Sequence, residues 1–326
     1  MHPCHPCSIV RPRHATRMLL NRVDALNALR CPVDGSELTF AIDGSIAKCS
    51  GGHEYVCSAE LPVLIDDSTS LLEPESCVRS QVLRRSPTGV SALARRLVSP
   101  TKRSTRNNVQ RLVDLLTEAK RPSRLLVVGG GTRGQGTELL YEHPDIEVLA
   151  FDVYVSPNVQ FVADAHQIPL DTASVDGVLI QAVLEHVLDP AAVVAEIRRV
   201  LRTDGLVYAE TPFMQQVHEG AYDFTRYTES GHRYLFRGFE EIASGASAGP
   251  AVQFLWSVDY LVSGLFRSRA AGRGAKLMLS WMRILDRLIP ERFAIDGASG
   301  VYFLGRRSEQ LLGGRELIAR YRGAQL

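Results

Sequence analysis

A glycine-rich turn and a following carboxylate have the spacing of a nucleotide-cofactor site. Gly129, Gly131 and Gly134 satisfy the pattern G-x-G-x-x-G directly after the apolar run 125–128. Glycines allow a backbone to adopt positive φ and to approach a ligand closely. Asp152 ends the next apolar run, where a carboxylate can accept hydrogen bonds from both ribose hydroxyls. The pattern alone fits NAD, FAD and adenosylmethionine sites alike.

A second set of reactive side chains lies in the stretch 210–228, after the fifth apolar run. It holds His218, Asp223 and Arg226. Loops outside the carboxyl ends of parallel strands are where substrates bind, so we expect an acceptor site here, with a purely structural lid as the alternative. Imidazole exchanges protons near neutral pH, which makes His218 the first candidate for a general base. Asp223 would orient it or replace it, and Arg226 would hold an anionic group of the acceptor. His186 is expected to cap or pack beside the fourth strand.

The six cysteines all lie in the first quarter of the chain. Residues 31–35 and 49–53 resemble the two turns of a short zinc-ribbon-like module, which occurs alone as an activator of methyltransferases and also fused to them. Cys31 and Cys49 match its ligands, whereas Asp34 and Gly52 stand at the other two ligand positions. His53 and Cys57 are the available substitutes. Tetrahedral zinc needs four ligands, so the sequence leaves open a zinc site on Cys31, Cys49 and His53 or a β-module without metal.

The elements that position these residues follow from hydrophobic periodicity. Short apolar runs at 125–128, 148–151, 159–162, 178–180 and 206–209 alternate with helical patterns, which predicts a parallel α/β sheet buried on both faces. Asp189 and Pro190 begin the clearest helix as N-cap and first turn. The run 300–305 predicts a closing strand, followed by a polar C-terminal helix.

The segments 163–170, 174–190 and 196–206 identify the cofactor by resemblance. They read ADAHQIPL, SVDGVLIQAVLEHVLDP and EIRRVLRTDGL. In this order they resemble the class I S-adenosylmethionine-dependent methyltransferases of the type 11-like group. The resemblance implies a doubly wound, mostly parallel seven-stranded sheet of the Rossmann-like kind. The acidic residue that the family places two positions before the first glycine is Val127 here.

The same resemblance assigns roles to single residues. The three glycines would border the methionine part of the cofactor and Asp152 would bind the ribose. Asp164 would accept from the adenine amino group and the backbone N–H of Ala165 would donate to the ring. Gln181 would line the floor beneath the sulfonium.

Composition and texture give the organisation of the chain. The net charge of +1 argues against nucleic acid as a partner. The N-terminus lacks the apolar core of a signal peptide, so we expect a cytoplasmic protein. We expect a disordered leader, in which Cys4 and Cys7 with His2 and His5 are an alternative metal pair, and then five further parts. The boundaries are 1–28 for the leader, 29–66 for the ribbon-like module, 67–106 for a basic linker or helix, 107–248 for the methyltransferase core, 249–298 for a helical cap or insertion, and 299–326 for the closing strand and last helix.

The nearly uncharged stretch 249–266 contains Asp259 and is too short for a spanning helix. The insertion would instead cap the substrate, form a homodimer face or touch the inner face of the membrane. The stretch 210–228 also resembles the loop of methyltransferases that act on bacterial surface glycans and lipids. We therefore expect methyl transfer to a small-molecule, glycan or lipid-linked acceptor, at oxygen. The alternatives are a non-catalytic protein that binds the cofactor or activates a partner, and an NAD(P)-dependent oxidoreductase.

Overall fold

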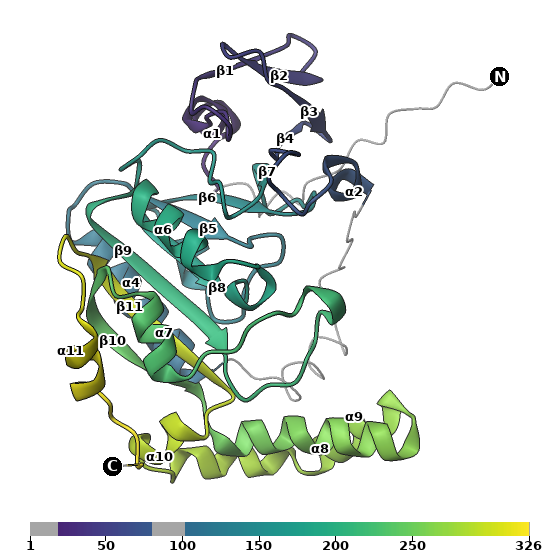
Figure 1. Cartoon of the computed structure of the whole chain (residues 1–326), viewed down its shortest axis with the longest axis vertical. Coiled ribbons are helices and arrows are strands. Elements are labelled where there is room, and N and C mark those ends of the chain that lie inside the picture. The colour runs from purple at the N-terminus through teal and green to yellow at the C-terminus, as the bar shows by residue number, and fades with distance from the viewer. Residues whose placement is uncertain (1–18, 80–101, 326) are drawn as a thin grey trace.

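The computed structural model describes residues 19–79 and 102–325 (Figure 1). In chain order the elements of these residues are α1 (Arg22–Ala28), β1 (Leu38–Phe40), β2 (Ile46–Cys49), β3 (Glu54–Ser58), β4 (Leu61–Leu64), α2 (Pro74–Arg79), α4 (Arg103–Thr117), β5 (Ser123–Val128), α5 (Glu138–Glu142), β6 (Ile146–Asp152), β7 (Phe161–Ala163), β8 (Val175–Gln181), η1 (Leu184–His186), α6 (Pro190–Val200), β9 (Leu201–Pro212), η2 (Gly220–Tyr222), α7 (Glu229–Leu235), β10 (Phe239–Ala248), α8 (Pro250–Phe266), α9 (Arg269–Met278), η3 (Ser280–Arg287), α10 (Glu291–Asp296), β11 (Gly300–Arg307) and α11 (Gly314–Ala319).

One sheet connects the strands in the order β1-β2-β3-β4-β7-β6-β5-β8-β9-β11-β10. The part from β7 to β10 is the predicted Rossmann-like core, parallel from β7 to β9 and closed by the antiparallel strands β11 and β10. The predicted number of seven strands is wrong for the whole sheet, which has eleven. The ribbon-like module adds its four strands because β4 pairs in parallel with β7, with Val63 opposite Val162.

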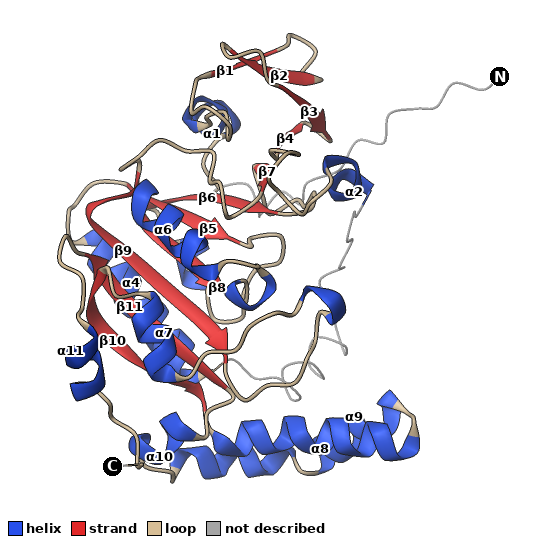
Figure 2. Cartoon of the chain, viewed as in Figure 1, coloured by secondary structure: helices blue, strands red, loops and turns tan. Residues whose placement is uncertain are grey.

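Helices cover both faces of this sheet, as expected for a doubly wound fold (Figure 2). Along β5, Leu126 and Val128 point into the apolar cluster shared with α6, whereas Leu125 and Val127 point into the cluster shared with α4. Strands buried on both faces have this continuous apolar composition. Burial of alternate residues in two separate clusters fixes the strand rotation, and therefore the direction in which the turn after β5 emerges.

The N-terminal boundaries differ from the predictions. The predicted leader 1–28 contains helix α1, which begins where the Asn21 Oδ1 accepts a hydrogen bond from the Asp24 N–H, 3.0 Å away. Ala25 and Leu29 of this segment are buried in the main apolar cluster, so it is part of the fold. The alternative metal pair of Cys4 and Cys7 lies outside the described residues, as does 80–101 of the predicted linker. Helix α4 starts at Arg103.

The predicted insertion is a helical layer between β10 and β11, formed by α8, α9, η3 and α10 (Figure 1). The helical pattern expected over 277–289 is a 3-10 segment, η3, which follows the end of α9 at Met278. Helix α6 begins at Pro190 with Asp189 as its N-cap, as predicted. Within the described ranges 19–79 and 102–325, no helix has the length and apolar character needed to cross a membrane.

Candidate functional site

The turn after β5 is packed so closely that side chains are excluded from it. Gly129 has φ +76°, and a Cβ placed on it would lie 2.3 Å from Val183 Cγ2. A Cβ on Gly131 would lie 2.6 Å from Asp152 Oδ2, and one on Gly134 would lie 2.1 Å from Gln181 Oε1. The three predicted glycines therefore bring the backbone against the ends of β6 and β8, which is where a nucleotide cofactor binds in this kind of sheet.

Asp152 stands at the carboxyl end of β6 with room for two ligand hydroxyls. Its Oδ2 accepts from the Gly131 N–H at 2.8 Å and its Oδ1 accepts from the Val153 N–H at 2.7 Å. Each oxygen keeps a further lone pair for a ribose hydroxyl. Burial raises the pKa of the Asp152 carboxyl to about 6, although the two backbone donors oppose this shift.

Gln181 ends β8 and leaves a buried acceptor free at the floor of the site. Its Oε1 has no hydrogen-bond partner among the described residues. Its amide group also bonds to the carboxylate of Glu210, the residue opposite it on β9, so the Nε2 side is committed and Oε1 faces the turn. An orphaned acceptor beside Gly134 suits a ligand that brings N–H donors, as the ammonium group of the methionine moiety does.

Glu210 is a buried carboxylate that the sequence did not single out. Burial opposes its ionisation, but Lys102 and the hydroxyls of Thr105 and Tyr208 hold the pKa of the Glu210 carboxyl below its ordinary value. The Lys102 Nζ lies 3.1 Å from Glu210 Oε2, and both hydroxyls lie 2.5 Å from Oε1. Val127, where the family has an acid, is packed in the apolar cluster under α4. The negative charge on this side of the site is therefore supplied by β9.

Asp164 lies at the other edge of the cofactor site and already has partners. Its Oδ1 accepts from the backbone N–H of His166 at 2.9 Å and lies 2.6 Å from the His166 Nδ1. Its Oδ2 accepts from the Ser70 hydroxyl at 2.5 Å. Burial would raise the pKa of Asp164, but these donors outweigh it and the pKa is lowered. Ala165 follows, buried, so the residues expected to meet the adenine lie together.

The loop after β9 joins His218, Asp223 and Arg226, as expected, but with different tasks. Asp223 Oδ2 accepts from the His218 backbone N–H at 2.8 Å and lies 3.3 Å from its ring Nδ1. Arg226 binds Asp223 through both carboxylate oxygens and donates its Nε–H to the Gln215 carbonyl at 2.9 Å. This Arg226 pairing holds the pKa of Asp223 well below its usual range, so Asp223 is suited to orient His218 and not to act as a base. The expectation that Arg226 holds an acceptor anion is wrong here, since its guanidinium is committed within the loop.

Glu185 and His186, in the 3-10 turn η1 after β8, complete a cluster with His218. Glu185 Oε1 lies 3.7 Å from His186 Nε2 and 3.8 Å from His218 Nε2. The Glu185 side chain is fully buried, and neither of its oxygens has a hydrogen-bond partner in the described part of the chain. Burial raises the pKa of the Glu185 carboxyl to about 7. His186 was expected only to cap or pack, so its place against His218, at 5.0 Å between ring centroids, is a new finding.

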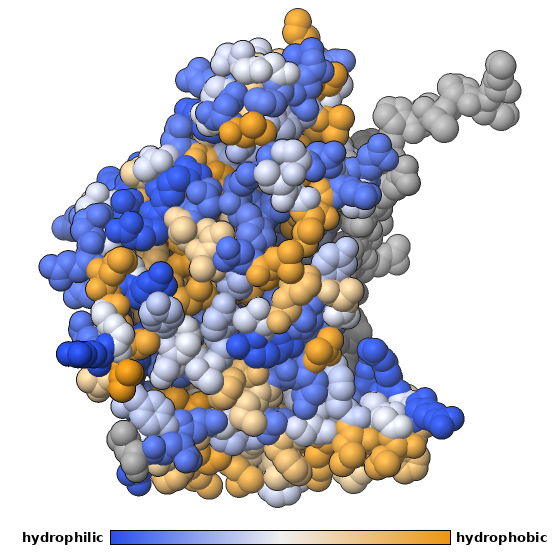
Figure 3. Space-filling view, in the orientation of Figure 1, coloured by the Kyte–Doolittle hydropathy of each residue, from blue (hydrophilic) through white to orange (hydrophobic). Residues whose placement is uncertain are grey.

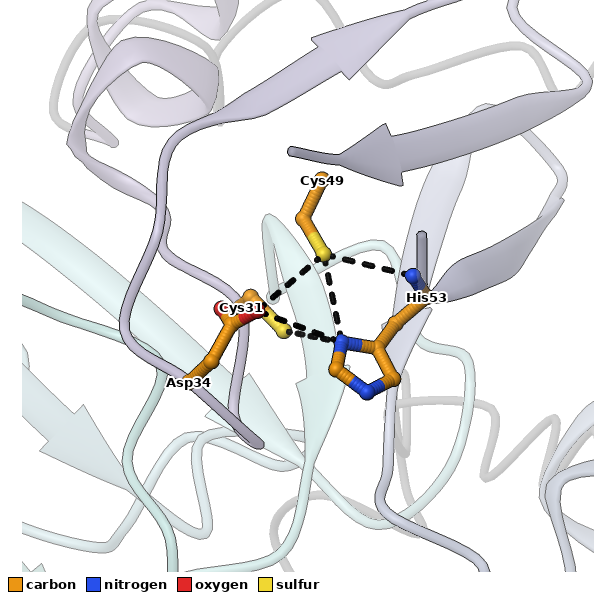
Figure 4. A group of neighbouring side chains, drawn as sticks. All are labelled: Cys31, Asp34, Cys49 and His53. Carbon is orange, nitrogen blue, oxygen red and sulfur yellow. Dashed lines mark hydrogen bonds and ion pairs between the residues drawn. The ribbon is translucent and has the colours of Figure 1, made fainter. Parts of the chain in front are cut away.

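The ribbon-like module brings four potential ligands together (Figure 4). The His53 Nδ1 lies 3.5 Å from Cys31 Sγ, 3.2 Å from Cys49 Sγ and 3.4 Å from Asp34 Oδ2. Tetrahedral zinc with ordinary bond lengths would separate such ligands by about 3.3–3.8 Å, so this set fits zinc. Asp34 joins the three predicted residues, whereas Cys57 lies outside the cluster beside Arg22 and Phe40.

Comparison with known proteins places this geometry among methyltransferases. Residues 126–209 match the family model described as a methyltransferase domain. A malonyl-[acyl-carrier protein] O-methyltransferase of Gallionella capsiferriformans (strain ES-2) is 24% identical over 200 residues, which cover 51% of this chain and 69% of that protein.

Two solved structures illustrate the similarity in fold. Phosphoethanolamine N-methyltransferase 2 of Haemonchus contortus, in complex with S-adenosyl-L-methionine, is 16% identical with a TM-score of 0.39, covering 62% of this chain and 53% of that chain. A chain from a complex that holds the Haloferax volcanii Trm112 methyltransferase activator is 17% identical with a TM-score of 0.39, covering 62% of this chain and 95% of that chain.

The matched segment runs from β5 to β9 and contains the turn, Asp152, Asp164 and Gln181. An oxidoreductase was expected only from the glycine pattern, which this segment shares with methyltransferases. The cofactor is S-adenosyl-L-methionine, and the chain carries a class I S-adenosylmethionine-dependent methyltransferase domain.

Proposed function

We propose that the protein transfers the methyl group of S-adenosylmethionine to a hydroxyl oxygen of a lipid-linked acceptor. The observation that carries this proposal is the link between the loop of His218 and the apolar insertion. Gln216 Nε2 donates to the Ser257 hydroxyl of α8 at 3.1 Å, and the Tyr260 hydroxyl of α8 donates to the Val217 carbonyl. An acceptor that arrives along the insertion is therefore delivered directly to the His218 loop.

The insertion has the surface of a membrane-contacting element. Large apolar side chains are exposed on α8, α9 and η3, and Figure 3 displays them gathered along the lower edge of the molecule. Basic residues flank them at the helix junctions, which favours an anionic lipid surface over a second copy of the same face. The apolar set includes Phe254, Leu261, Leu265, Phe266, Leu277, Met278, Trp281, Ile284 and Leu288. The basic set includes Arg267, Arg269, Arg273, Arg283 and Arg287.

Transfer to oxygen is supported by the side chains beside the methyl end of the cofactor. A hydroxyl must lose its proton as its oxygen takes the methyl, whereas the sulfonium is already activated and needs mainly alignment. The cluster of Glu185, His186 and His218 follows Val183, whose side chain packs against Gly129. It therefore offers proton-accepting groups at the right end of the site, with Asp223 fixing His218. The sequence relative from Gallionella is named as an O-methyltransferase, which agrees with this assignment.

The test is transfer of isotope-labelled methyl from S-adenosylmethionine to a lipid extract and, separately, to an aqueous metabolite extract. We expect label in the lipid fraction, with mass spectrometry placing it on an oxygen. His218→Ala should reduce the rate by about 10²–10⁴-fold, the usual contribution of a proton-transfer residue, without changing cofactor affinity. His143→Ala, on the loop after α5, is the matched control and should transfer at the wild-type rate.

Label confined to the aqueous fraction would overturn the lipid-linked acceptor, and label on nitrogen would overturn transfer to oxygen. Full activity in His218→Ala would instead support a structural lid. Cofactor binding with no transfer to either fraction would favour the non-catalytic alternative.

A further inference from the structure

The cluster of Glu185, His186 and His218 presents three acceptor atoms to one another. Each histidine is held through its Nδ1: His186 Nδ1 lies 2.7 Å from the Tyr222 carbonyl, and His218 Nδ1 lies 3.3 Å from Asp223 Oδ2. A carbonyl or carboxylate accepts, so both rings donate from Nδ1 and carry a lone pair on Nε2. Both lone pairs face Glu185 Oε1, at 3.7 and 3.8 Å.

This arrangement is repulsive unless a positive charge lies between the atoms. Glu185 is fully buried and its two oxygens have no hydrogen-bond partner among the described residues. A buried polar group without a partner is expensive, and a buried carboxylate more so. Protons or a metal cation at the centre would relieve the repulsion, and the orientation of the rings distinguishes the two. Shared protons do not require both Nε2 atoms to converge on one point, whereas a common cation does.

We propose that Glu185, His186 and His218 bind a divalent cation, with an open coordination position for the acceptor hydroxyl. Two imidazoles and one carboxylate form the ligand set of a catalytic zinc site. The hydrogen bonds on the far side of each ring are the outer-shell partners that such sites use to fix their histidines. Tetrahedral zinc would separate Nε2 and Oε1 by about 3.3 Å, so the observed atoms need to close by only a few tenths of an ångström.

The cation would change how the acceptor loses its proton. A hydroxyl bound to the metal has a lowered pKa, so its O–H bond ionises and the proton leaves to solvent. The oxygen then forms a bond to the methyl carbon while the carbon–sulfur bond breaks, and that electron pair stays on sulfur as S-adenosylhomocysteine. This catalytic role rests on the proposed function, whereas the binding of the cation does not.

Titration of the metal-stripped, full-length protein with Co²⁺ tests the site by absorbance. Cobalt bound to Cys31 and Cys49 gives a thiolate charge-transfer band in the near ultraviolet, whereas cobalt on nitrogen and oxygen gives only visible bands. We expect both signals in the wild type. Glu185→Gln and His186→Ala should each weaken the thiolate-free signal by more than about 100-fold, the upper range for loss of an outer-shell partner, and leave the thiolate band unchanged. His143→Ala should titrate as the wild type.

Circular dichroism melting establishes that each variant is folded, and the thiolate band is an internal check of the same kind. A wild-type protein that shows no thiolate-free cobalt signal, or a Glu185→Gln protein that keeps it in full, would overturn the cation site. If such a protein still methylated its acceptor, the proposed function would stand without the cation. Cation binding without transfer to any extract would leave the site in place and contradict the proposed function.

Discussion

At the scale of single residues, the site depends on carboxylates whose surroundings differ. Asp152 is buried with two backbone donors and its pKa is raised to about 6, whereas Asp223 is paired with Arg226 and its pKa is lowered. The first therefore changes charge near neutral pH, and the second stays ionised. A ribose diol donates to a carboxylate, so only the ionised form of Asp152 binds the cofactor fully.

Cofactor affinity should therefore depend on pH through Asp152. As pH falls below about 6, adenosylhomocysteine should bind up to about tenfold more weakly per pH unit, because a proton competes with the ligand for the carboxylate. Calorimetric titrations between pH 5 and 8 measure this, and Asp152→Asn should bind weakly without a pH dependence in this range. A pH-independent affinity in the wild type would contradict the assigned role.

Without ligand, the same carboxylate should affect stability in the opposite direction. The folded-state pKa of Asp152 is raised from 3.8 to about 6. Its contribution is therefore complete below the unfolded pKa and is lost as pH rises through about 6. The loss is about 3 kcal/mol for about two pKa units. Chemical denaturation should show the wild type losing this amount between pH 4 and 7 relative to Asp152→Asn. Equal changes in both proteins would mean that the carboxyl is hydrated in the folded state.

At the scale of elements, most of the core could be predicted because periodicity and glycine spacing report local structure. The five apolar runs fall within β5 to β9, and Asp189 caps α6 as expected. Strand β10 had no such signal, since its sequence FEEIASGASA is rich in small and acidic residues and its pairing with β11 is a long-range contact. The cluster of Glu185 and His218 was missed for the same reason, because the two lie on separate segments after different strands.

The ribbon-like module shows the same limit and suggests a dependence of the cofactor site on zinc. Pairing of β4 with β7 ends at Leu64 and Ala163, one residue before Asp164, and Ser70 then bonds to Asp164. Binding of zinc to Cys31, Asp34, Cys49 and His53 would stabilise β4 indirectly.

We expect Cys49→Ser to lower the melting temperature of the zinc-loaded protein and to weaken adenosylhomocysteine binding several-fold. Metal analysis and melting curves with and without a chelator measure the first effect. Cys57→Ser is the matched control, since Cys57 lies outside the cluster. Equal metal content in the two variants would exclude a zinc site here.

At the scale of the whole molecule, the sheet separates two functions along its length. The ribbon-like module continues the edge beside Asp164, and the insertion continues from β10 at the opposite edge, with the cofactor turn between them (Figure 1). The insertion is therefore placed to contact a surface without covering the cofactor side of the sheet.

Vesicle flotation should test this arrangement. The protein should float with vesicles that contain anionic phospholipid and not with purely zwitterionic ones, and higher salt should weaken the binding. Replacing Leu265 and Phe266 by Ser should reduce flotation, because both side chains are exposed and apolar. Leu311→Ser, exposed outside the insertion, is the control. A concentration-dependent dimer that the Leu265 and Phe266 changes abolish, with no flotation, would assign the face to a second copy.

The most direct test of the central claim is calorimetric titration of the purified protein with adenosylhomocysteine and, separately, with NADH. The account predicts that adenosylhomocysteine binds with one site per chain, that Asp152→Ala abolishes this binding, and that NADH gives no heat of binding. Binding of NADH alone, or adenosylhomocysteine binding that Asp152→Ala leaves intact, would contradict the assignment of the glycine turn and Asp152 as the cofactor site.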